Sequence, residues 1–299
     1  MVAVASCLFA LRACADTVDV PLQVVDQDGQ PVAEALLKSD SGDKELSDEN
    51  GKAFLEVKKR AFYNRFYAEK EGFYPTATDG ENSPLAKDFD PLKLIKIQLK
   101  KVKNPIPMYA KSLIAEQGGV LKMPNYDGNS YGYDLVTGDW VTPHGKGKVA
   151  DFIFQFEGEF SNKPYGRLIQ YDNKIKVSFS NEHDGIIAWE GTSEAGRKYG
   201  SELVSDYEAP KEGYQDNWVQ RTWKEKGGYH QTTSNMDRNF NFRVRTKVDE
   251  KGNIISAHYG KIYGDFMSFI YYLNPTPNDR NVEFDPKRNL LPDGNVQRP

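Results

Sequence analysis

The sequence predicts an all-β protein built from two antiparallel β-sandwich domains, of which the second is larger and compatible with a jelly-roll-like arrangement. Apolar and polar residues alternate with a period of two over many short stretches, as they do in half-buried strands. Aromatic residues make up 12% of the chain, and 25 Gly and 16 Pro supply tight turns. With 299 residues, the chain exceeds the comfortable size of one hydrophobic core, so two domains are expected.

Residues 1–15 have the pattern of a signal peptide. After Met1 they are apolar except for Arg12, and they end in Ala13-Cys14-Ala15 before the polar Asp16. A bilayer span takes roughly 20 apolar residues, so the segment is too short to cross a membrane, and we expect cleavage and an extracytoplasmic location. No Lys or Arg precedes the apolar run, which leaves an upstream start open. Two further alternatives are a lipid anchor on Cys7 or Cys14 and a plain buried N-terminal segment.

Cysteine content and net charge exclude several classes of function. Both cysteines, Cys7 and Cys14, lie in the expected signal peptide. Cleavage would therefore leave no disulfide, no thiol nucleophile and no Cys-ligated metal. The formal net charge of −4 argues against a binder of nucleic-acid backbones, which needs a basic face, and against electrostatic docking to anionic lipid. No other apolar run reaches membrane length, so no transmembrane segment is expected.

Residues 16–100 are expected to form the first β-sandwich. Val20, Leu22 and Val24 alternate with polar neighbours, and Gly29 and Gly51 allow the positive φ angles of tight turns. Strands spaced roughly 8–12 residues apart are typical of a sandwich. The further strands are expected at residues 32–37, 53–57, 62–69 and 92–99.

Three segments of this domain resemble a known family. They are residues 24–35 (VVDQDGQPVAEA), 48–53 (DENGKA) and 72–75 (GFYP). Together they are similar to the carboxypeptidase-regulatory-like, or transthyretin-like, β-sandwich. The resemblance implies an accessory module of secreted or surface proteins, and it brings no catalytic residue with it.

The Asp26-x-Asp28-Gly29 motif has two interpretations, a hairpin turn and the start of a calcium loop. An EF-type loop needs further acidic residues at alternate positions and a Glu at its twelfth position. The twelfth residue here is Leu37. The turn is therefore favoured, and neither a metal nor a cofactor is expected.

Residues 101–107 are expected to link the domains, because Pro105 and Pro107 block a helix and keep the chain extended. The second domain is expected at residues 108–275, followed by a polar surface tail at 276–299. Residues 108–117 fit a short helix or a strand, and Asp172-Asn173 is expected to form a two-residue hairpin turn. The strands are expected at residues 151–156, 167–171, 174–179, 240–246, 254–262 and 266–273.

The second domain also resembles other sequences through two proline-rich segments. Residues 104–109 (NPIPMY) and 274–280 (NPTPNDR) are similar to segments of uncharacterised secreted bacterial proteins. That resemblance implies no activity.

Residues 131–148 form the strongest candidate for a ligand site. This stretch combines aromatic, acidic and basic side chains with glycines in an expected loop, where binding residues of a sandwich are usually carried. Trp140, with Tyr131 or Tyr133, offers flat faces suited to a sugar ring. The alternative is that these aromatic rings close the end of the sandwich. The candidate ligand-binding residues are Tyr131, Tyr133, Asp139, Trp140, His144, Asp184 and Arg280.

Catalytic motifs are weak in this sequence. The four His residues are too far apart to form a local zinc pair. Two carboxylates could hydrolyse a glycosidic bond, and the nominated acids are Asp139, Asp184, Asp265 and Glu283. Arg280 is expected to form a local ion pair that pins the tail, or else to hold an anionic ligand.

Three functions follow from these patterns. The favoured one is a secreted or envelope-associated bacterial protein with a non-catalytic binding role, its partner a glycan or an envelope protein. The second is a carboxylate-based extracellular hydrolase of polysaccharide. The third is a structural component of the envelope.

Overall fold

The computed structural model describes residues 16–60, 64–78, 90–113, 121–158, 170–191, 200–235, 237–266 and 268–299. Within these ranges the regular structure consists of strands and two short 3-10 helices, which confirms the all-β prediction. No helix in these ranges combines the length and the apolar character needed for crossing a membrane. The expected signal peptide, residues 1–15, lies outside the described residues.

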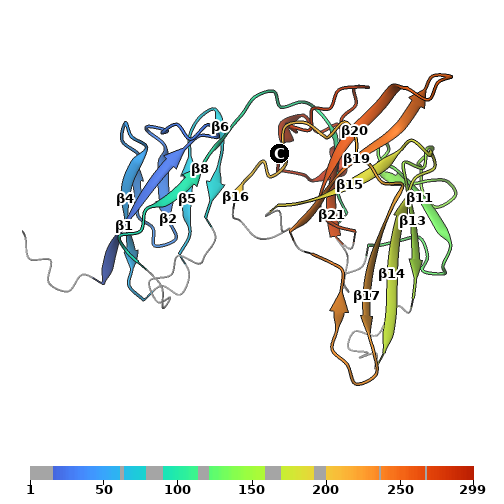
Figure 1. The fold of residues 1–299 in the computed structure, drawn as a ribbon, viewed down its shortest axis with the longest axis horizontal. Helices are drawn as coiled ribbons and strands as arrows, with labels where there is room; N and C mark the ends of the chain where they lie inside the picture. Colours follow the sequence, from blue (N-terminus) through green and yellow to red (C-terminus); the bar gives the residue numbers. More distant parts are fainter. Residues whose placement is uncertain are drawn as a thin grey trace, which may run out of the picture. The chain divides into compact units, whose positions relative to one another are not determined.

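The chain divides into two compact units (Figure 1). Unit 1 takes in the described residues up to Lys101, together with the pair Gly200–Ser201 from much later in the sequence. Unit 2 takes in the other described residues from Val102 onward. Each unit has a hydrophobic core of its own.

Unit 1 packs a three-stranded sheet, β4-β1-β8, against a five-stranded sheet, β16-β7-β5-β2-β3. Strand β1 pairs antiparallel with β4 and parallel with β8. Every second side chain of β4 is buried in the core, as the alternation predicted. The strands are β1 (Thr17–Val25), β2 (Leu36–Ser39), β3 (Lys44–Leu46), β4 (Lys52–Lys58), β5 (Phe66–Glu69), β6 (Phe73–Tyr74), β7 (Thr76–Ala77), β8 (Ile95–Gln98), β9 (Lys100–Lys101) and β16 (Gly200–Ser201).

The Asp26 carboxylate builds the first predicted turn of unit 1. Its Oδ1 atom accepts the backbone N–H groups of Asp28 at 3.0 Å and Gln30 at 2.9 Å, and its Oδ2 atom lies 2.7 Å from Lys101 Nζ. The Asp26 carboxylate therefore stabilises the turn. Three predicted strands of this unit begin later than expected: β2 starts at Leu36, β5 at Phe66 and β8 at Ile95.

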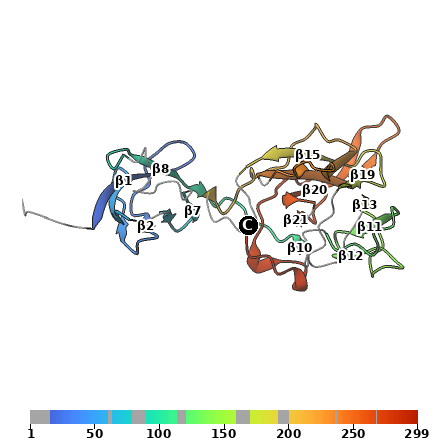
Figure 2. The same ribbon diagram turned by 90° about the horizontal axis from the view of Figure 1, so that it is seen from below.

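Unit 2 packs a five-stranded sheet, β10-β21-β20-β19-β15, against a six-stranded sheet, β12-β11-β13-β14-β17-β18. Figure 2 shows the two groups of strands from below. Aromatic side chains from both sheets fill the core; Phe152, for example, meets Phe242 with ring centroids 5.0 Å apart. The strands are β10 (Tyr109–Leu113), β11 (Ser130–Asp134), β12 (Asp139–Trp140), β13 (Phe152–Glu157), β14 (Tyr171–Ser178), β15 (Gly185–Glu190), β17 (Asn217–Lys224), β18 (Gln231–Thr232), β19 (Arg238–Val248), β20 (Ile254–Asp265) and β21 (Ser268–Leu273).

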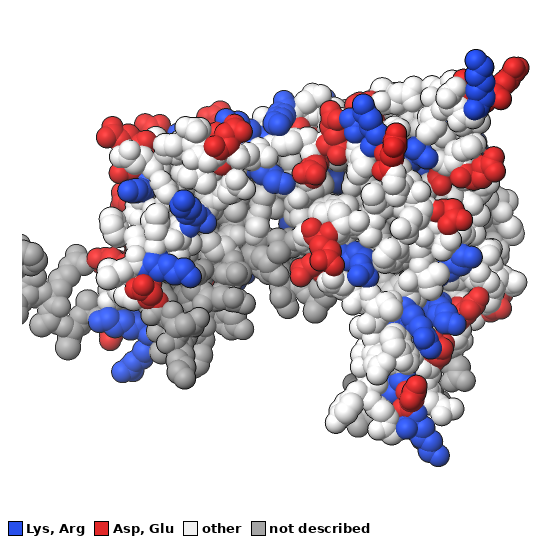
Figure 3. Space-filling view, in the orientation of Figure 1, with Lys and Arg blue, Asp and Glu red and all other residues white. Residues whose placement is uncertain are grey.

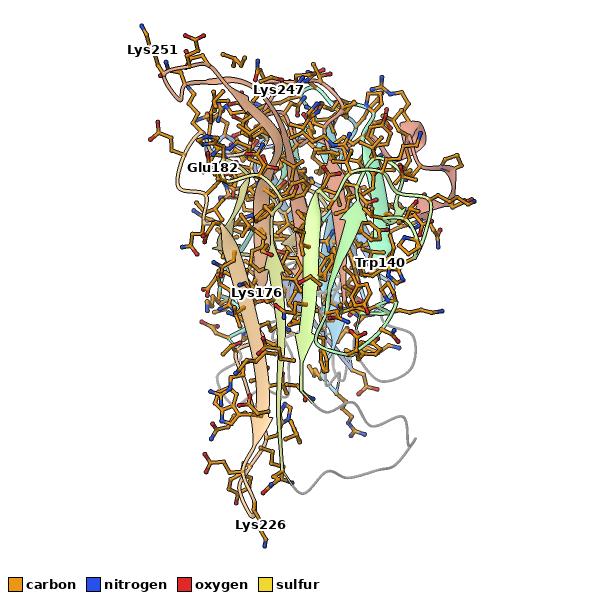
Figure 4. The ribbon with its side chains drawn as sticks, turned by 90° about the vertical axis from the view of Figure 1, so that its right-hand side faces the viewer. Trp140, Lys176, Glu182, Lys226, Lys247 and Lys251 are labelled. Carbon is orange, nitrogen blue, oxygen red and sulfur yellow. The ribbon has the colours of Figure 1, made fainter. Side chains whose placement is uncertain are left out.

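The predicted hairpin turn at Asp172-Asn173 is wrong. Strand β14 runs straight through both residues, because Asp172 pairs with Trp223 and Asn173 pairs with Thr222 on β17. Residues 167–169, which the prediction assigned to the first strand of this hairpin, lie outside the described residues. The ends of β14, β17 and β18 project from unit 2, with Lys226 at the tip (Figures 1 and 4). We call this part, residues 170–174 and 221–233, the extension.

The segments before and after the second sandwich are tied to it. Strand β10 resolves part of the open choice at residues 108–117 in favour of a strand, while 114–117 lie outside the described residues. Phe284 and Val296, from the polar C-terminal segment, are buried with Met108. The 3-10 helices in this segment are η1 (Pro286–Arg288) and η2 (Pro292–Gly294).

Candidate functional site

The aromatic residues of the 131–148 stretch pack inward. Tyr131 and Tyr133 are buried on β11, and burial raises the pKa of both phenols. Trp140 is half-buried on β12, where its ring meets Tyr133 and Phe154 edge to face, with centroids 5.2 Å and 5.7 Å apart. The structure thus brings Trp140 and Tyr133 together as part of the core.

Asp139 precedes Trp140 on β12, and His144 lies in the turn that follows. The Asp139 carboxylate accepts the backbone N–H groups of Trp140 at 2.8 Å and Lys146 at 2.9 Å. Gly145 packs so closely that an added Cβ would lie 2.6 Å from Asp139 Oδ1. The His144 side chain is exposed, and its ring contacts Tyr131 edge to face, with centroids 4.9 Å apart. The Asp139 carboxylate therefore stabilises the backbone of this turn.

Sequence reasoning missed the polar cluster beneath this turn. Arg245 donates to both oxygens of Asp151 at 2.8 Å and to Asp134 Oδ1 at 2.9 Å. Both carboxylates are buried, with 1% and 4% of their side-chain surface exposed, and 26% of the Arg245 side chain is exposed. Arg245 also has a φ of +56°, which only a few per cent of non-glycine residues adopt. The cluster draws together residues more than ninety positions apart, a signal that local patterns do not carry.

Asp184 joins this cluster through the backbone. Its two oxygens accept the N–H groups of Arg245 at 3.0 Å and Thr246 at 2.9 Å, which fixes the unusual backbone at Arg245. Burial raises the pKa of Asp184 and Asp151. Burial alone would also raise the pKa of Asp134, but N–H groups of Lys148, Thr137 and Val149 hold it below its usual value.

The remaining nominated residues also contact the fold. Arg280 donates to the Ala209 carbonyl at 2.6 Å and to Glu208, so its ion-pair partner is Glu208 and not a neighbouring acid of the tail. Glu283 accepts the backbone N–H groups of Lys103 and Asn104. Asp265 accepts the Ser234 hydroxyl. Each of the four acids nominated for hydrolysis thus accepts a hydrogen bond from within unit 2.

A groove on the extension brings together residues that the sequence patterns did not single out. It has a volume of about 520 Å³, within the range of roughly 300–1,000 Å³ that is usual for ligand pockets. It is open to solvent, and Tyr229, elsewhere in the extension, is 91% exposed. The residues lining the groove are Gln170, Tyr171, Asp172, Arg221, Trp223, Lys224, Glu225 and Lys226.

Arg221, Trp223 and Asp172 share one face of the extension. Arg221 donates two hydrogen bonds to Asp172, at 2.7 Å and 2.8 Å, and its guanidinium lies 4.6 Å from the centre of the Trp223 ring. The hydrogen bonds from Arg221 lower the pKa of Asp172. Both charged side chains are more than 40% exposed. This arrangement offers a flat aromatic ring beside paired hydrogen-bonding groups that solvent reaches.

The loop between β17 and β18 is held to the groove by side chains. The Tyr171 hydroxyl bonds to His230 Nδ1 at 2.5 Å, and the Thr222 and Thr232 hydroxyls lie 3.1 Å apart. A sequence signal for this site exists in residues 217–224 (NWVQRTWK), where Arg221 and Trp223 fall on one face of β17 and the buried Gln220 falls on the other. Among the described residues, no group of three or more His, Cys, Asp or Glu side chains is arranged to hold a metal ion.

Comparisons with known proteins assign neither a family nor a function. No protein-family model and no curated protein sequence matches this chain. A 3-chlorocatechol 1,2-dioxygenase from Rhodococcus opacus is similar over 30% of this chain and 61% of its own, at 20% identity and a TM-score of 0.23. The chain thus spans less than two thirds of that dioxygenase. The resemblance of residues 16–100 to the carboxypeptidase-regulatory-like family stays a prediction.

Two solved structures from Bacteroides are similar over a larger share of this chain. A candidate membrane-associated protein of unknown function from Bacteroides fragilis covers 86% of this chain and 98% of its own, at 11% identity and a TM-score of 0.23. A candidate carbohydrate-binding protein from Bacteroides uniformis covers 88% and 98%, at 10% identity and a TM-score of 0.18. At these scores no assignment follows.

Proposed function

We propose that this protein works outside the cytoplasm as a non-catalytic binding protein and that it holds a glycan in the groove of the extension. The proposal rests on one observation: the solvated Arg221–Asp172 pair and the half-buried Trp223 ring line one open groove. Planar polar groups can bond pairs of sugar hydroxyls, and an indole face suits the C–H face of a sugar ring. The proposed location rests on the signal-peptide pattern of residues 1–15.

The groove is favoured over the 131–148 turn because its polar atoms face solvent. In the turn, Asp139 already accepts two backbone N–H groups and Trp140 packs against two core rings. In the extension, the side chains of Arg221 and Asp172 hydrogen-bond to one another and remain more than 40% exposed. A sugar hydroxyl can therefore approach them without breaking the backbone structure.

The test is binding of the purified protein to a broad glycan array, with Trp223→Ala and Trp140→Ala as a matched pair of tryptophan variants. We expect reproducible binding that Trp223→Ala abolishes and Trp140→Ala retains. Loss of binding only in Trp140→Ala would move the site to the 131–148 turn. An array without any bound glycan would refute the proposal.

A further inference from the structure

We infer that the glycan bound in the groove is anionic, an acidic polysaccharide whose sugars carry carboxylate or sulfate groups; this inference rests on the function proposed above. It starts from the strand register. Lys174 lies directly opposite Arg221, and Lys176 lies opposite Val219. Directly opposite residues of an antiparallel pair point to the same face of the sheet. The two lysines therefore continue the face of Arg221 and Trp223 beyond the groove.

This face is open to a long ligand. Val219, between Arg221 and the base of β17, is 45% exposed although it is apolar, and Lys176 is exposed opposite it. Alternate residues of a strand are roughly 6.6–6.8 Å apart, so Lys174 and Lys176 form a short cationic row along β14. Figure 4 shows Lys176 on the strand that leads toward the tip at Lys226. A polymer seated beside Trp223 would run along this row.

Charge in this region is positive, although the chain as a whole carries −4. Three acids oppose the cations: Asp172 is engaged by Arg221, Glu157 lies opposite Lys174 in the ladder with β13, and Glu225 lines the groove. Figure 3 shows basic side chains along the extension, interspersed with acidic ones. The cations of the groove and of the β14 row are Lys174, Lys176, Arg221, Lys224 and Lys226.

The surroundings of the cations favour an acidic glycan over a simple polyanion. In the described part of the chain, Lys174 and Lys176 form no ion pair, so both ammonium groups are available to an anion. The cations are interspersed with three acidic residues, and the indole ring of Trp223 lies next to Arg221. Proteins that bind a nucleic-acid backbone need closely spaced positive charges, because the phosphates lie close together. An acidic polysaccharide carries widely spaced charges on rings that also have hydroxyl groups and an apolar face. It therefore matches this mixed surface better than a nucleic acid does.

The test compares polygalacturonate, dextran sulfate, neutral dextran and single-stranded DNA as probes for the intact protein by affinity electrophoresis and calorimetry. The variant is Lys174→Gln/Lys176→Gln. Its control is Lys247→Gln/Lys251→Gln, which removes the same charge from the exposed β19–β20 hairpin of unit 2 (Figure 4). We expect the β14 variant to lose about tenfold in affinity for the acidic polysaccharide, and the control to lose little. Thermal unfolding of both variants checks that the fold is intact.

The outcomes separate this inference from the function that it rests on. Binding that weakens with salt and with the β14 variant supports an anionic ligand, and the stronger of the two acidic probes identifies carboxylate or sulfate. Neutral glycans of the array bound as tightly as acidic ones, with no effect of the β14 variant, would overturn the inference and leave glycan binding in place. DNA bound as well as the polysaccharides would also overturn it. A protein that binds none of the acidic or neutral glycans would refute both proposals.

Discussion

Two arginines of unit 2 make the same bidentate pair with an aspartate in opposite surroundings. Arg245 holds Asp151 through two hydrogen bonds of 2.8 Å, and Arg221 holds Asp172 through bonds of 2.7 Å and 2.8 Å. Only 1% of the Asp151 side chain is exposed, whereas 45% of the Asp172 side chain is. Hydrogen-bond geometry alone therefore does not distinguish a structural pair from an available one.

Solvent access makes the difference. Around Arg245 the carboxylates of Asp151 and Asp184 also accept backbone N–H groups. These hydrogen bonds therefore stabilise the backbone after β11 and within β19. Around Arg221 the pair spans only two neighbouring strands and stands beside an open groove. Residue types alone do not separate the two pairs, and their different exposure to solvent is why we place the proposed binding site on the extension.

The largest effect is expected from Arg245→Met. Removing the guanidinium leaves Asp151 and Asp134 buried without their cation, a loss that typically costs about 3–5 kcal/mol. Urea unfolding of unit 2 would measure it. Arg221→Met is the matched control and should leave the unfolding midpoint almost unchanged, because its partner is solvated. Equal destabilisation by the two variants would contradict the comparison.

The sequence predicted the sandwich layers better than it predicted the site. The alternation along residues 52–58 and the turn at Asp26 are local signals, and both appear in the structure. The Arg245 cluster depends on partners 61 to 111 positions away, which no local pattern reveals. The error at Asp172-Asn173 has the same cause, since turn-forming residues became strand once β17 paired with them. Trp140 was identified by its residue type, while its packing against Phe154 depends on the fold.

The two tryptophans should separate stability from binding. Trp140→Ala removes contacts with two core rings and should cost about 2 kcal/mol, less than the roughly 3–5 kcal/mol of a fully buried aromatic ring, because Trp140 is half-exposed. It should leave glycan binding intact. Chemical denaturation and a glycan-retention assay on the same preparation give both values. Retention lost with stability unchanged would reverse the assignment.

Trp223→Ala should have the opposite profile. Its ring lies on the extension, under Arg221, and packs against none of the core aromatic rings among the described contacts. We expect a cost below about 1 kcal/mol, as for surface substitutions, together with loss of glycan retention. Trp223→Phe, which keeps a flat ring, should recover part of the binding. A large fall in unfolding free energy would instead make Trp223 part of the fold.

The smallest effect expected is an opposite pH response of two aspartates. The pKa of Asp184 is raised by burial, so its contribution to stability is present below about pH 3.8 and is lost as pH rises through its folded pKa. The pKa of Asp172 is lowered by Arg221, so its contribution is present above about pH 3.8 and is lost as pH falls through its folded pKa.

Urea unfolding of Asp184→Asn and Asp172→Asn at pH 3 and pH 7 tests this contrast. The advantage of the unmodified protein over Asp184→Asn should be larger at pH 3, because the substituted amide does not titrate and contributes no pH-dependent stability. Its advantage over Asp172→Asn should be larger at pH 7, and smaller in size because Asp172 is solvated. A change of the same sign in both variants would mean that burial does not distinguish the two aspartates, and the case for an available Arg221–Asp172 pair would weaken with it.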